Sequence, residues 1–130
     1  MEEHFVNYNQ SLSLKELGFD EPCIARYIIP GDLVFKGCYE DSNIIHLELT
    51  QNDICEAHVL APLKSQVFKW FRDEHNLFGD FHYNELTEKW RLCSVINIGK
   101  VSFDFEEEFK TYEEAESACI DRLISILNKK

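Results

Sequence analysis

Apolar residues recur at helical spacing near the C-terminal end of the chain. The positions concerned are Ala115, Ala118, Cys119, Ile120, Leu123, Ile124, Ile126 and Leu127. Intervals of three and four residues place such side chains on one face of a helix. Thr111 and Glu114 have the spacing of a capping box, in which each side chain bonds the backbone N–H of the other residue. The pattern therefore predicts an amphipathic helix over residues 112–128.

A second helix is predicted over residues 62–76. Pro62 suits a first helical turn, where the N–H that proline lacks has no intrahelical partner. Asn76 is a residue that can end a helix in the left-handed conformation. We expect charged residues such as Lys64 to face solvent on this helix. Its buried stripe is expected to consist of Leu63, Val67, Trp70 and Phe71.

Shorter runs of β-branched, aromatic or alternating apolar residues predict strands. Turn-forming segments such as Pro30-Gly31-Asp32 separate them. Closely spaced strands favour antiparallel pairing. The predicted strands lie within residues 23–29, 33–36, 44–49, 54–60, 81–83, 90–98 and 101–105.

The predicted fold class is α+β, a mainly antiparallel sheet with the helices at about 62–76 and 112–128 packed on one face. The length of 130 residues fits a single domain over residues 1–130. Residues 1–13 show no sustained period and are expected to form a loose N-terminal arm. A short helical turn is expected after this arm, with Ser13 as its cap and Gly18 as its end.

Composition narrows the classes of partner. The chain carries 24 acidic and 13 basic residues, a formal net charge of -11. This charge disfavours direct binding of nucleic acid, which requires basic side chains to displace phosphate counterions, and it favours a basic partner. The first ten residues lack the basic start and apolar stretch of a secretion signal, and no apolar run has the length of a membrane span. We therefore expect a cytoplasmic protein without membrane association.

The cysteines indicate a reducing compartment rather than a disulfide framework. The chain has five of them, an odd number, with no C-x-x-C pair. Cys55 and His58 lie close together in sequence, but residues three apart on a strand point to opposite faces and do not form a simple metal clamp. Nucleotide-binding and hydrolase motifs are also missing from the sequence. No metal, cofactor or catalytic residue is assigned.

Asp80, His82 and Asn84 form the first candidate site. Residues two apart on a strand share a face, so these three are expected opposite Phe81 and Tyr83. If the aromatic face packs on the helices, the polar face is simply solvated. The alternative is an acid–base pair or a recognition patch on the open sheet. A similar site around His46, Glu48 and His58 is a further alternative.

The second candidate is an acidic segment that comprises Asp104, Glu106, Glu107 and Glu108 and continues through Glu113, Glu114 and Glu116. It lacks the spaced oxygen ligands and the glycine of a calcium loop. Two interpretations stay open, a solvated surface and a contact surface for a basic partner.

Aromatic residues crowd the second half of the chain. Most of them are expected in the core, and any that stay exposed would mark an interface, because Trp and Tyr contribute strongly to interface energetics. The residues are Trp70, Phe71, Phe78, Phe81, Tyr83, Trp90, Phe103, Phe105, Phe109 and Tyr112.

Several segments together resemble a group of small proteins from anaerobic gut bacteria and their phages or mobile elements. These segments are Leu17–Cys23, Leu60–Pro62, Trp70–Leu77, Trp90 and Phe109–Ile120. The group carries no assigned activity, so the resemblance implies a compact domain in a mobile-element setting.

The leading hypothesis is a non-enzymatic module that binds another protein through an aromatic and acidic surface. A narrower version is an inhibitor that imitates the charge of DNA. The alternative class is a small-ligand binder or an enzyme with a site on the polar face of the sheet. Self-association as a homodimer is a third possibility, and the sequence leaves the oligomeric state open.

Overall fold

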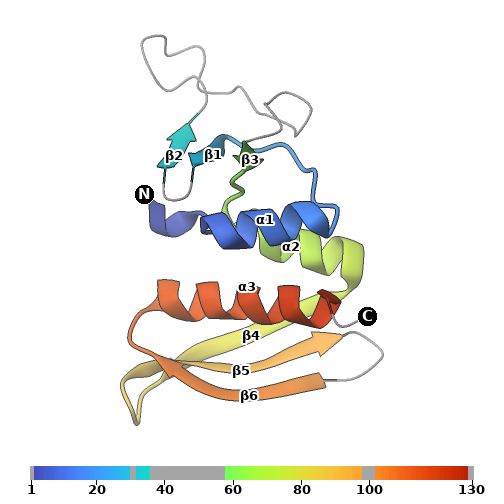
Figure 1. The fold of residues 1–130 in the computed structure, drawn as a ribbon. Helices are drawn as coiled ribbons and strands as arrows, with labels where there is room; N and C mark the ends of the chain where they lie inside the picture. Colours follow the sequence, from blue (N-terminus) through green and yellow to red (C-terminus); the bar gives the residue numbers. More distant parts are fainter. Residues whose placement is uncertain (1, 30–31, 36–57, 98–101, 129–130) are drawn as a thin grey trace. The chain divides into compact units, whose positions relative to one another are not determined.

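A computed structural model of the protein describes residues 2–29, 32–35, 58–97 and 102–128 (Figure 1). The chain divides into two compact units, Met1–Leu63 and Lys64–Lys130. Each unit contains a three-stranded antiparallel sheet and at least one helix, so the predicted α+β class with antiparallel pairing is confirmed. The described residues form two sheets, whereas the sequence predicted one. The assignment of residues 1–130 to a single domain stays a prediction, and each unit is described by itself.

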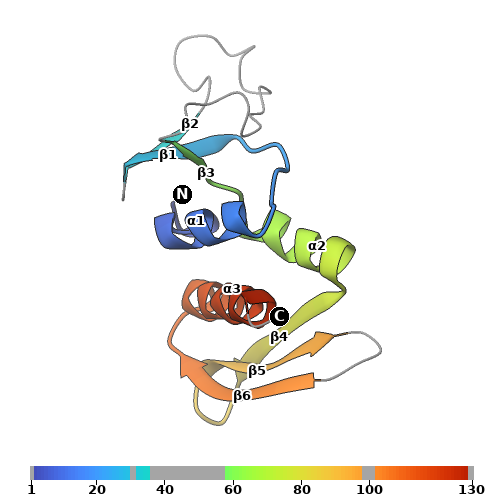
Figure 2. The ribbon, with the colours of Figure 1, turned by 45° about the vertical axis from the view of Figure 1, so that its right-hand side comes forward.

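The first unit combines two short helical segments with a small sheet. The helical segments are η1 (Glu2–His4) and α1 (Tyr8–Glu16), and the strands are β1 (Ala25–Ile29), β2 (Asp32–Phe35) and β3 (Val59–Leu60). The sheet has the order β2-β1-β3, with Tyr27 of β1 paired to Leu33 and to Val59. Figures 1 and 2 both show α1 lying beside this sheet, and α1 contacts β3.

The segment expected as a loose arm contains α1 instead. Asn7 caps the helix, because its Oδ1 accepts the N–H of Gln10 at 2.8 Å and the Gln10 Oε1 accepts the N–H of Asn7 at 2.9 Å. This reciprocal pair is a capping box with Asn and Gln in place of Ser and Glu. Ser13, the expected cap, therefore lies inside the helix. Gly18 follows the helix end with φ +95, a left-handed conformation that suits glycine.

The predicted hairpin over residues 23–36 is confirmed as β1 paired antiparallel to β2. Its turn residues Pro30 and Gly31 lie outside the described residues. The predicted strand at 44–49 and most of the strand at 54–60 also lie outside them. The last two residues of the latter form β3, which pairs with β1.

The second unit is a helix, a three-stranded meander and a second helix. Its elements are α2 (Lys64–His75), β4 (Leu77–Asn84), β5 (Lys89–Asn97), β6 (Ser102–Phe109) and α3 (Tyr112–Asn128). Neighbouring strands are antiparallel in the order β4-β5-β6. Figures 1 and 2 show α3 running along one face of this sheet. Asn76 connects α2 to β4 with φ 55, which confirms the predicted left-handed stop.

The core of the second unit is formed by α3 and the face of the sheet that it covers. Leu77, Leu92 and Val95 of the sheet are completely buried. The helix buries Ala115, Cys119, Ile120, Leu123, Ile124, Ile126 and Leu127, which is the predicted stripe apart from Ala118. A Cβ at Gly79 would overlap the Cys119 Sγ, so glycine at this position allows β4 and α3 to approach closely.

The first turn of α3 follows the predicted cap with one difference. The Thr111 Oγ1 accepts the N–H of Glu114 at 3.1 Å, as expected for an N-cap threonine. The Glu114 carboxylate lies 3.2 Å from the same hydroxyl and accepts its proton, rather than bonding the Thr111 backbone. Both bonds satisfy groups at the helix start, and the observed bounds of α3 are the predicted ones, 112–128.

Candidate functional site

The polar residues of β4 lie where the sequence placed them. Asp80, His82 and Asn84 alternate with Phe81 and Tyr83 along the strand. Gly79, on the same face as Phe81, touches α3, so the polar row is on the face of the sheet turned away from that helix. Asp80 and His82 are exposed and Asn84 is half-buried.

The neighbours of this row favour a solvated sheet face. Asp80 is paired across the sheet with Ser94, and His82 with Arg91. The Asn84 Oδ1 accepts the N–H of Leu86 at 3.0 Å, which is an Asx turn at the start of the β4–β5 connection. Asn84 therefore shapes the turn, and Asp80 and His82 are exposed to solvent.

The acidic segment does not form one cluster in the part of the chain that the structure describes. Glu107 points toward α3, where its Oε1 accepts the Arg122 Nε–H at 2.8 Å. Glu108 is on the opposite face, and its carboxylate accepts the Thr87 hydroxyl at 2.6 Å. Asp104 is paired across the sheet with Ser94. The side chains of Asp104 and Glu106 lie outside the described residues.

The remaining polar candidates are not brought together. His46 and Glu48 lie outside the described residues, and His58 is half-buried just before β3. Across residues 2–29, 32–35, 58–97 and 102–128, no three His, Cys, Asp or Glu side chains are grouped as metal ligands would be. Over the same ranges, no helix has the length and apolarity needed to cross a bilayer.

Five aromatic side chains in the second unit form a continuous chain of contacts, which we call the aromatic row. Its members are Tyr83, Trp90, Tyr112, Phe81 and Phe68. The ring centroids are 5.5 Å apart for Tyr83 and Trp90, 5.0 Å for Trp90 and Tyr112, and 5.3 Å for Tyr112 and Phe81. Phe81 is in turn 6.1 Å from Phe68 of α2. These spacings are those of stabilising aromatic pairs.

The aromatic row lies on the helix side of the sheet, yet part of it is exposed. Tyr83 is 46% and Tyr112 is 44% accessible, and Leu86 in the adjoining turn is 96% accessible. The reason is the position of the helix, because α3 begins only at Tyr112, and Tyr83 lies near the end of β4. The end of the sheet therefore presents apolar side chains to solvent.

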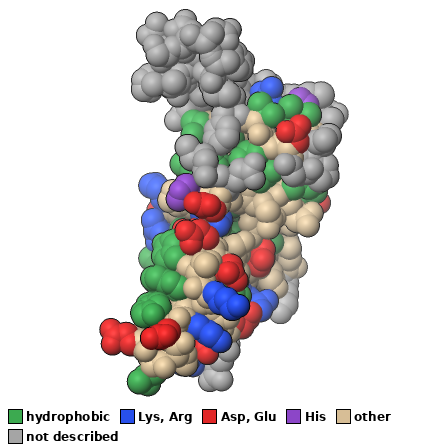
Figure 3. All heavy atoms as spheres, turned by 90° about the vertical axis from the view of Figure 1, so that its left-hand side faces the viewer, with side chains coloured by type: hydrophobic (Ala, Val, Ile, Leu, Met, Phe, Trp, Pro, Cys, Tyr) green, Lys and Arg blue, Asp and Glu red, His purple; other side chains and the backbone are tan. Residues whose placement is uncertain are grey.

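Acidic side chains flank the exposed end of the aromatic row. Glu85 and Glu88 are exposed in the β4–β5 connection, and Glu114 is exposed near the start of α3. Lys89 and Lys110 are the exposed basic residues in the same two stretches. Figure 3 shows hydrophobic side chains gathered beside acidic ones in the lower part of the view. The local net charge is therefore negative, as it is for the whole chain.

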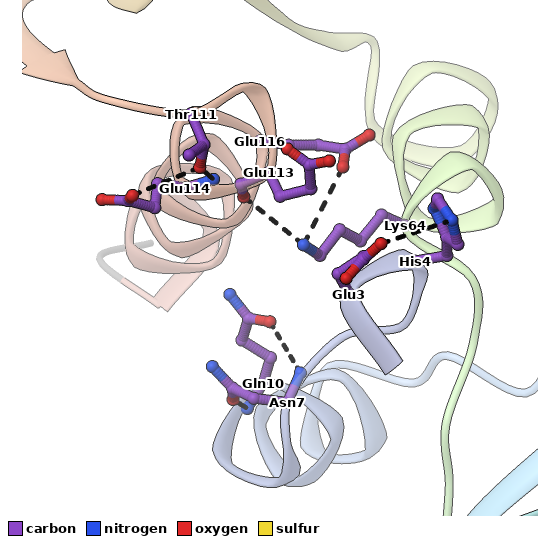
Figure 4. A network of polar contacts seen from close by, with 9 residues as sticks. All are labelled: Glu3, His4, Asn7, Gln10, Lys64, Thr111, Glu113, Glu114 and Glu116. Atoms are coloured by element: carbon purple, nitrogen blue, oxygen red, sulfur yellow. Dashed lines mark hydrogen bonds and ion pairs between the residues drawn. The ribbon is translucent and has the colours of Figure 1, made fainter. Parts of the chain in front are cut away.

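Lys64 is a feature that the sequence analysis missed. It was expected to face solvent, but it is only 5% exposed. Its Nζ lies 3.8 Å from the Glu116 carboxylate and 3.4 Å from the Glu113 carbonyl oxygen, as Figure 4 shows. These partners are about fifty residues away along the chain, so no local pattern reports them. The same figure shows the separate Asn7–Gln10 box of the first unit.

The charges around Glu116 affect Tyr112. Burial, the negative charges of Glu116 and Glu113, and a hydrogen bond from the Tyr112 hydroxyl to Glu116 together raise the pKa of Tyr112 above its ordinary value of 10.0. The phenol thus stays protonated at neutral pH and acts as a hydrogen-bond donor. Glu116 is thus the ion-pair partner of Lys64, and its negative charge also acts on Tyr112.

A groove of about 320 Å³ adjoins one end of the aromatic row. Phe68 and Arg72 of α2, Phe81 of β4, and Tyr112 and Glu116 of α3 line it. Cys119 is packed behind Gly79 in the same region. Burial, followed by the charges of Asp80 and Glu116, raises the pKa of the Cys119 thiol to about 12. This thiol is therefore a core residue and not a nucleophile.

Comparisons with protein-family models, with curated proteins and with solved structures found no match for this chain.

Proposed function

We propose that this protein is a non-enzymatic protein-binding module and that the aromatic row is its contact surface. The single observation that supports this is the exposure of Tyr83 and Tyr112 within a continuous row of rings. Tyrosine and tryptophan combine a large apolar area with a polar edge and are enriched in binding hot spots. The half-buried neighbours Phe81 and Trp90 hold the exposed rings in place, which lowers the entropy lost on binding.

The charge around the row favours a basic partner. Glu85, Glu88 and Glu114 flank the exposed rings, and the whole chain has a net charge of -11. Arg or Lys side chains of a partner would meet both these carboxylates and the faces of the rings. Such contacts speed association and weaken as salt is added.

The setting proposed for this module is the cytoplasm of a cell that hosts mobile elements. Two buried free thiols, Cys23 and Cys119, are in keeping with a reducing compartment. The mobile-element setting rests on the sequence resemblance alone. The alternative of an enzyme site on the polar face of the sheet is not favoured by the arrangement of Asp80, His82 and Asn84, since Asn84 is used by the turn.

The test is affinity purification from the native cell, with the wild type compared with the double variant Tyr83→Ser, Tyr112→Ser. The matched control is Leu12→Ser, Ile96→Ser, because these two side chains are similarly exposed but lie outside the aromatic row. We expect a stoichiometric partner with the wild type and the control, and its loss with the tyrosine variant. The partner should also dissociate as salt is raised.

Three results would contradict the proposal. One is the absence of any stoichiometric partner of the wild type. Another is equal recovery of the partner by the tyrosine variant. The third is equal loss from the control, which would show a general effect of removing exposed apolar side chains. Light scattering of the pure protein distinguishes a foreign partner from a second copy of this chain.

A further inference from the structure

The groove between α2, β4 and α3 carries an inference about a small ligand, and it shares Phe68, Phe81 and Tyr112 with the aromatic row. It lies wholly in the second unit, and neither Tyr83 nor Trp90 lines it. Its volume of about 320 Å³ is at the lower end of the range for small-molecule sites, about 300–1,000 Å³. A recess of this size suits a ligand with one ring rather than a nucleotide-sized cofactor.

Half of the eight residues that line the groove are aromatic. Phe81 of β4 contacts both Phe68 of α2 and Tyr112 of α3 as part of the aromatic row, and Phe78 is a further lining residue. Gly79, between the two phenylalanines of β4, contributes no side chain. A flat apolar ring would therefore be surrounded by ring faces and edges, an arrangement that aromatic groups favour.

The charges of the groove are not balanced. Glu116 is already paired with the Lys64 ammonium group, at 3.8 Å. Arg72 also lines the groove, is exposed, and makes no ion pair with any residue in the described ranges. Its guanidinium is permanently charged and can bind a carboxylate through two parallel N–H donors. The charge of Arg72 is therefore uncompensated among the described residues, and the groove favours an anionic ligand.

We propose that this groove binds a small aromatic carboxylic acid, with its ring against Phe68, Phe81 and Tyr112 and its carboxylate on Arg72. The ring contacts supply apolar burial, and Arg72 distinguishes an acid from neutral or cationic molecules of the same shape.

The experiment is a titration followed by amide chemical shifts in NMR, with phenylpropionate as the probe. Phenylpropanol and phenylpropylamine are its neutral and cationic analogues. We expect saturable shifts at Ser65, Gly79 and Tyr112 with the acid at up to millimolar concentration. The alcohol should bind about fivefold more weakly, since an exposed ion pair contributes up to about 1 kcal/mol, and the amine more weakly still.

Two variants test the assigned roles. Arg72→Gln should reduce affinity for the acid to that for the alcohol and leave the alcohol unchanged. Arg91→Gln removes the same charge from the sheet face turned away from α3 and should change neither affinity. Ser65→Phe, at an exposed lining position of α2, should block all three probes while the spectrum stays folded.

The proposal is overturned by equal affinity of the acid and the alcohol in the wild type. It is also overturned by shifts confined to other parts of the protein, or by the absence of shifts at millimolar acid. Loss of alcohol binding in Arg72→Gln would assign this residue a structural role and would contradict the ionic contact. None of these outcomes depends on whether the aromatic row binds a protein.

Discussion

The two faces of strand β4 differ in composition, in their cover by α3 and in candidate function. Leu77, Gly79, Phe81 and Tyr83 face the side of the sheet that α3 covers. Asp80, His82 and Asn84 face the other side. Polar residues were the more obvious functional candidates in the sequence. In the structure they form a solvated face and a turn, whereas the aromatic face continues beyond its helix cover and becomes a surface.

The contrast shows that exposure depends on where a covering element ends. Along the first part of β4, α3 covers Leu77 and touches Gly79. Near the end of the strand, only the first turn of α3 is present, so Tyr83 stays about half accessible. The same alternation of residues therefore produces core at one end and a binding surface at the other.

The largest difference in stability between the two faces of the sheet is expected for substitutions of Leu92 and Ile96 in β5. Leu92→Ala should lower the free energy of unfolding by about 2–5 kcal/mol, because the side chain is completely buried under α3. Ile96→Ala should lower it by less than about 1 kcal/mol, because Ile96 is 40% accessible. Denaturant unfolding of both variants checks the pair, and equal losses would show that the second face is also covered.

The pH dependence of stability provides a second test of the covered face. Cys119 has a pKa of about 12 in the folded protein and an ordinary value of 9.0. A raised pKa means that the folded state holds the proton more tightly, so this contribution is fully present below pH 9 and is lost as pH rises toward 12.

Cys119→Ala removes the titrating thiol. The slope of the free energy of unfolding against pH should therefore be smaller for the variant, by up to about 1.4 kcal/mol per pH unit. The measurement is denaturant unfolding of the wild type and the variant at a series of alkaline pH values. Parallel curves would mean that the thiol is not held protonated under α3. Tyr112 also has a raised pKa and is present in both proteins, so the difference between them isolates Cys119.

Gly79 and Asp80 are neighbours that point to opposite faces. Gly79→Ala should cost about 1–3 kcal/mol, since its Cβ would overlap the Cys119 Sγ. Asp80→Ala, on the exposed face, should change stability by about 0.5 kcal/mol or less.

A double-mutant cycle with Cys119→Ala sharpens this comparison. Removing the Sγ should relieve most of the overlap, so the cost of Gly79→Ala should be smaller in the Cys119→Ala background. Thermal or denaturant unfolding of the four proteins measures the coupling. Additive costs would show that the closeness of β4 and α3 is not what requires glycine.

Two lysines of α2 extend the contrast to smaller effects. Lys64 is buried against Glu116, and its replacement by Ala should cost about 1–3 kcal/mol because it leaves a poorly hydrated carboxylate without its partner. Lys69 forms an exposed pair with Asp73 at 2.5 Å, and Lys69→Ala should cost about 0.5 kcal/mol or less. High salt should reduce the second effect more than the first. Similar costs for both variants would contradict the burial of Lys64.

Local patterns in the sequence predicted most of the second unit. The stripe of α3, the Thr111 cap, the stop at Asn76 and the alternation of β4 are all properties of short segments, and the structure confirms them. The helix at Tyr8–Glu16 was missed because its residues show no sustained apolar period, although Asn7 and Gln10 form a favourable cap.

Long-range features could not be predicted. The burial of Lys64 depends on Glu113 and Glu116, and the aromatic row joins residues of α2, β4, β5 and α3. The crowding of aromatic residues was visible in the sequence, but which rings stay exposed is decided by where α3 begins. The sequence alone showed which residues of β4 share a face. It could not show which of the two faces would serve as a binding surface.

Hydroxyl-radical footprinting of the complex with the purified partner tests the central claim most directly. Oxidation of each side chain is compared in the free and bound protein. The account predicts protection of Tyr83, Trp90 and Tyr112 and no change at His82 and Ile96. Protection of His82 and Ile96 with unchanged oxidation of Tyr83 and Tyr112 would contradict it, and would transfer the interaction to the polar face of the sheet.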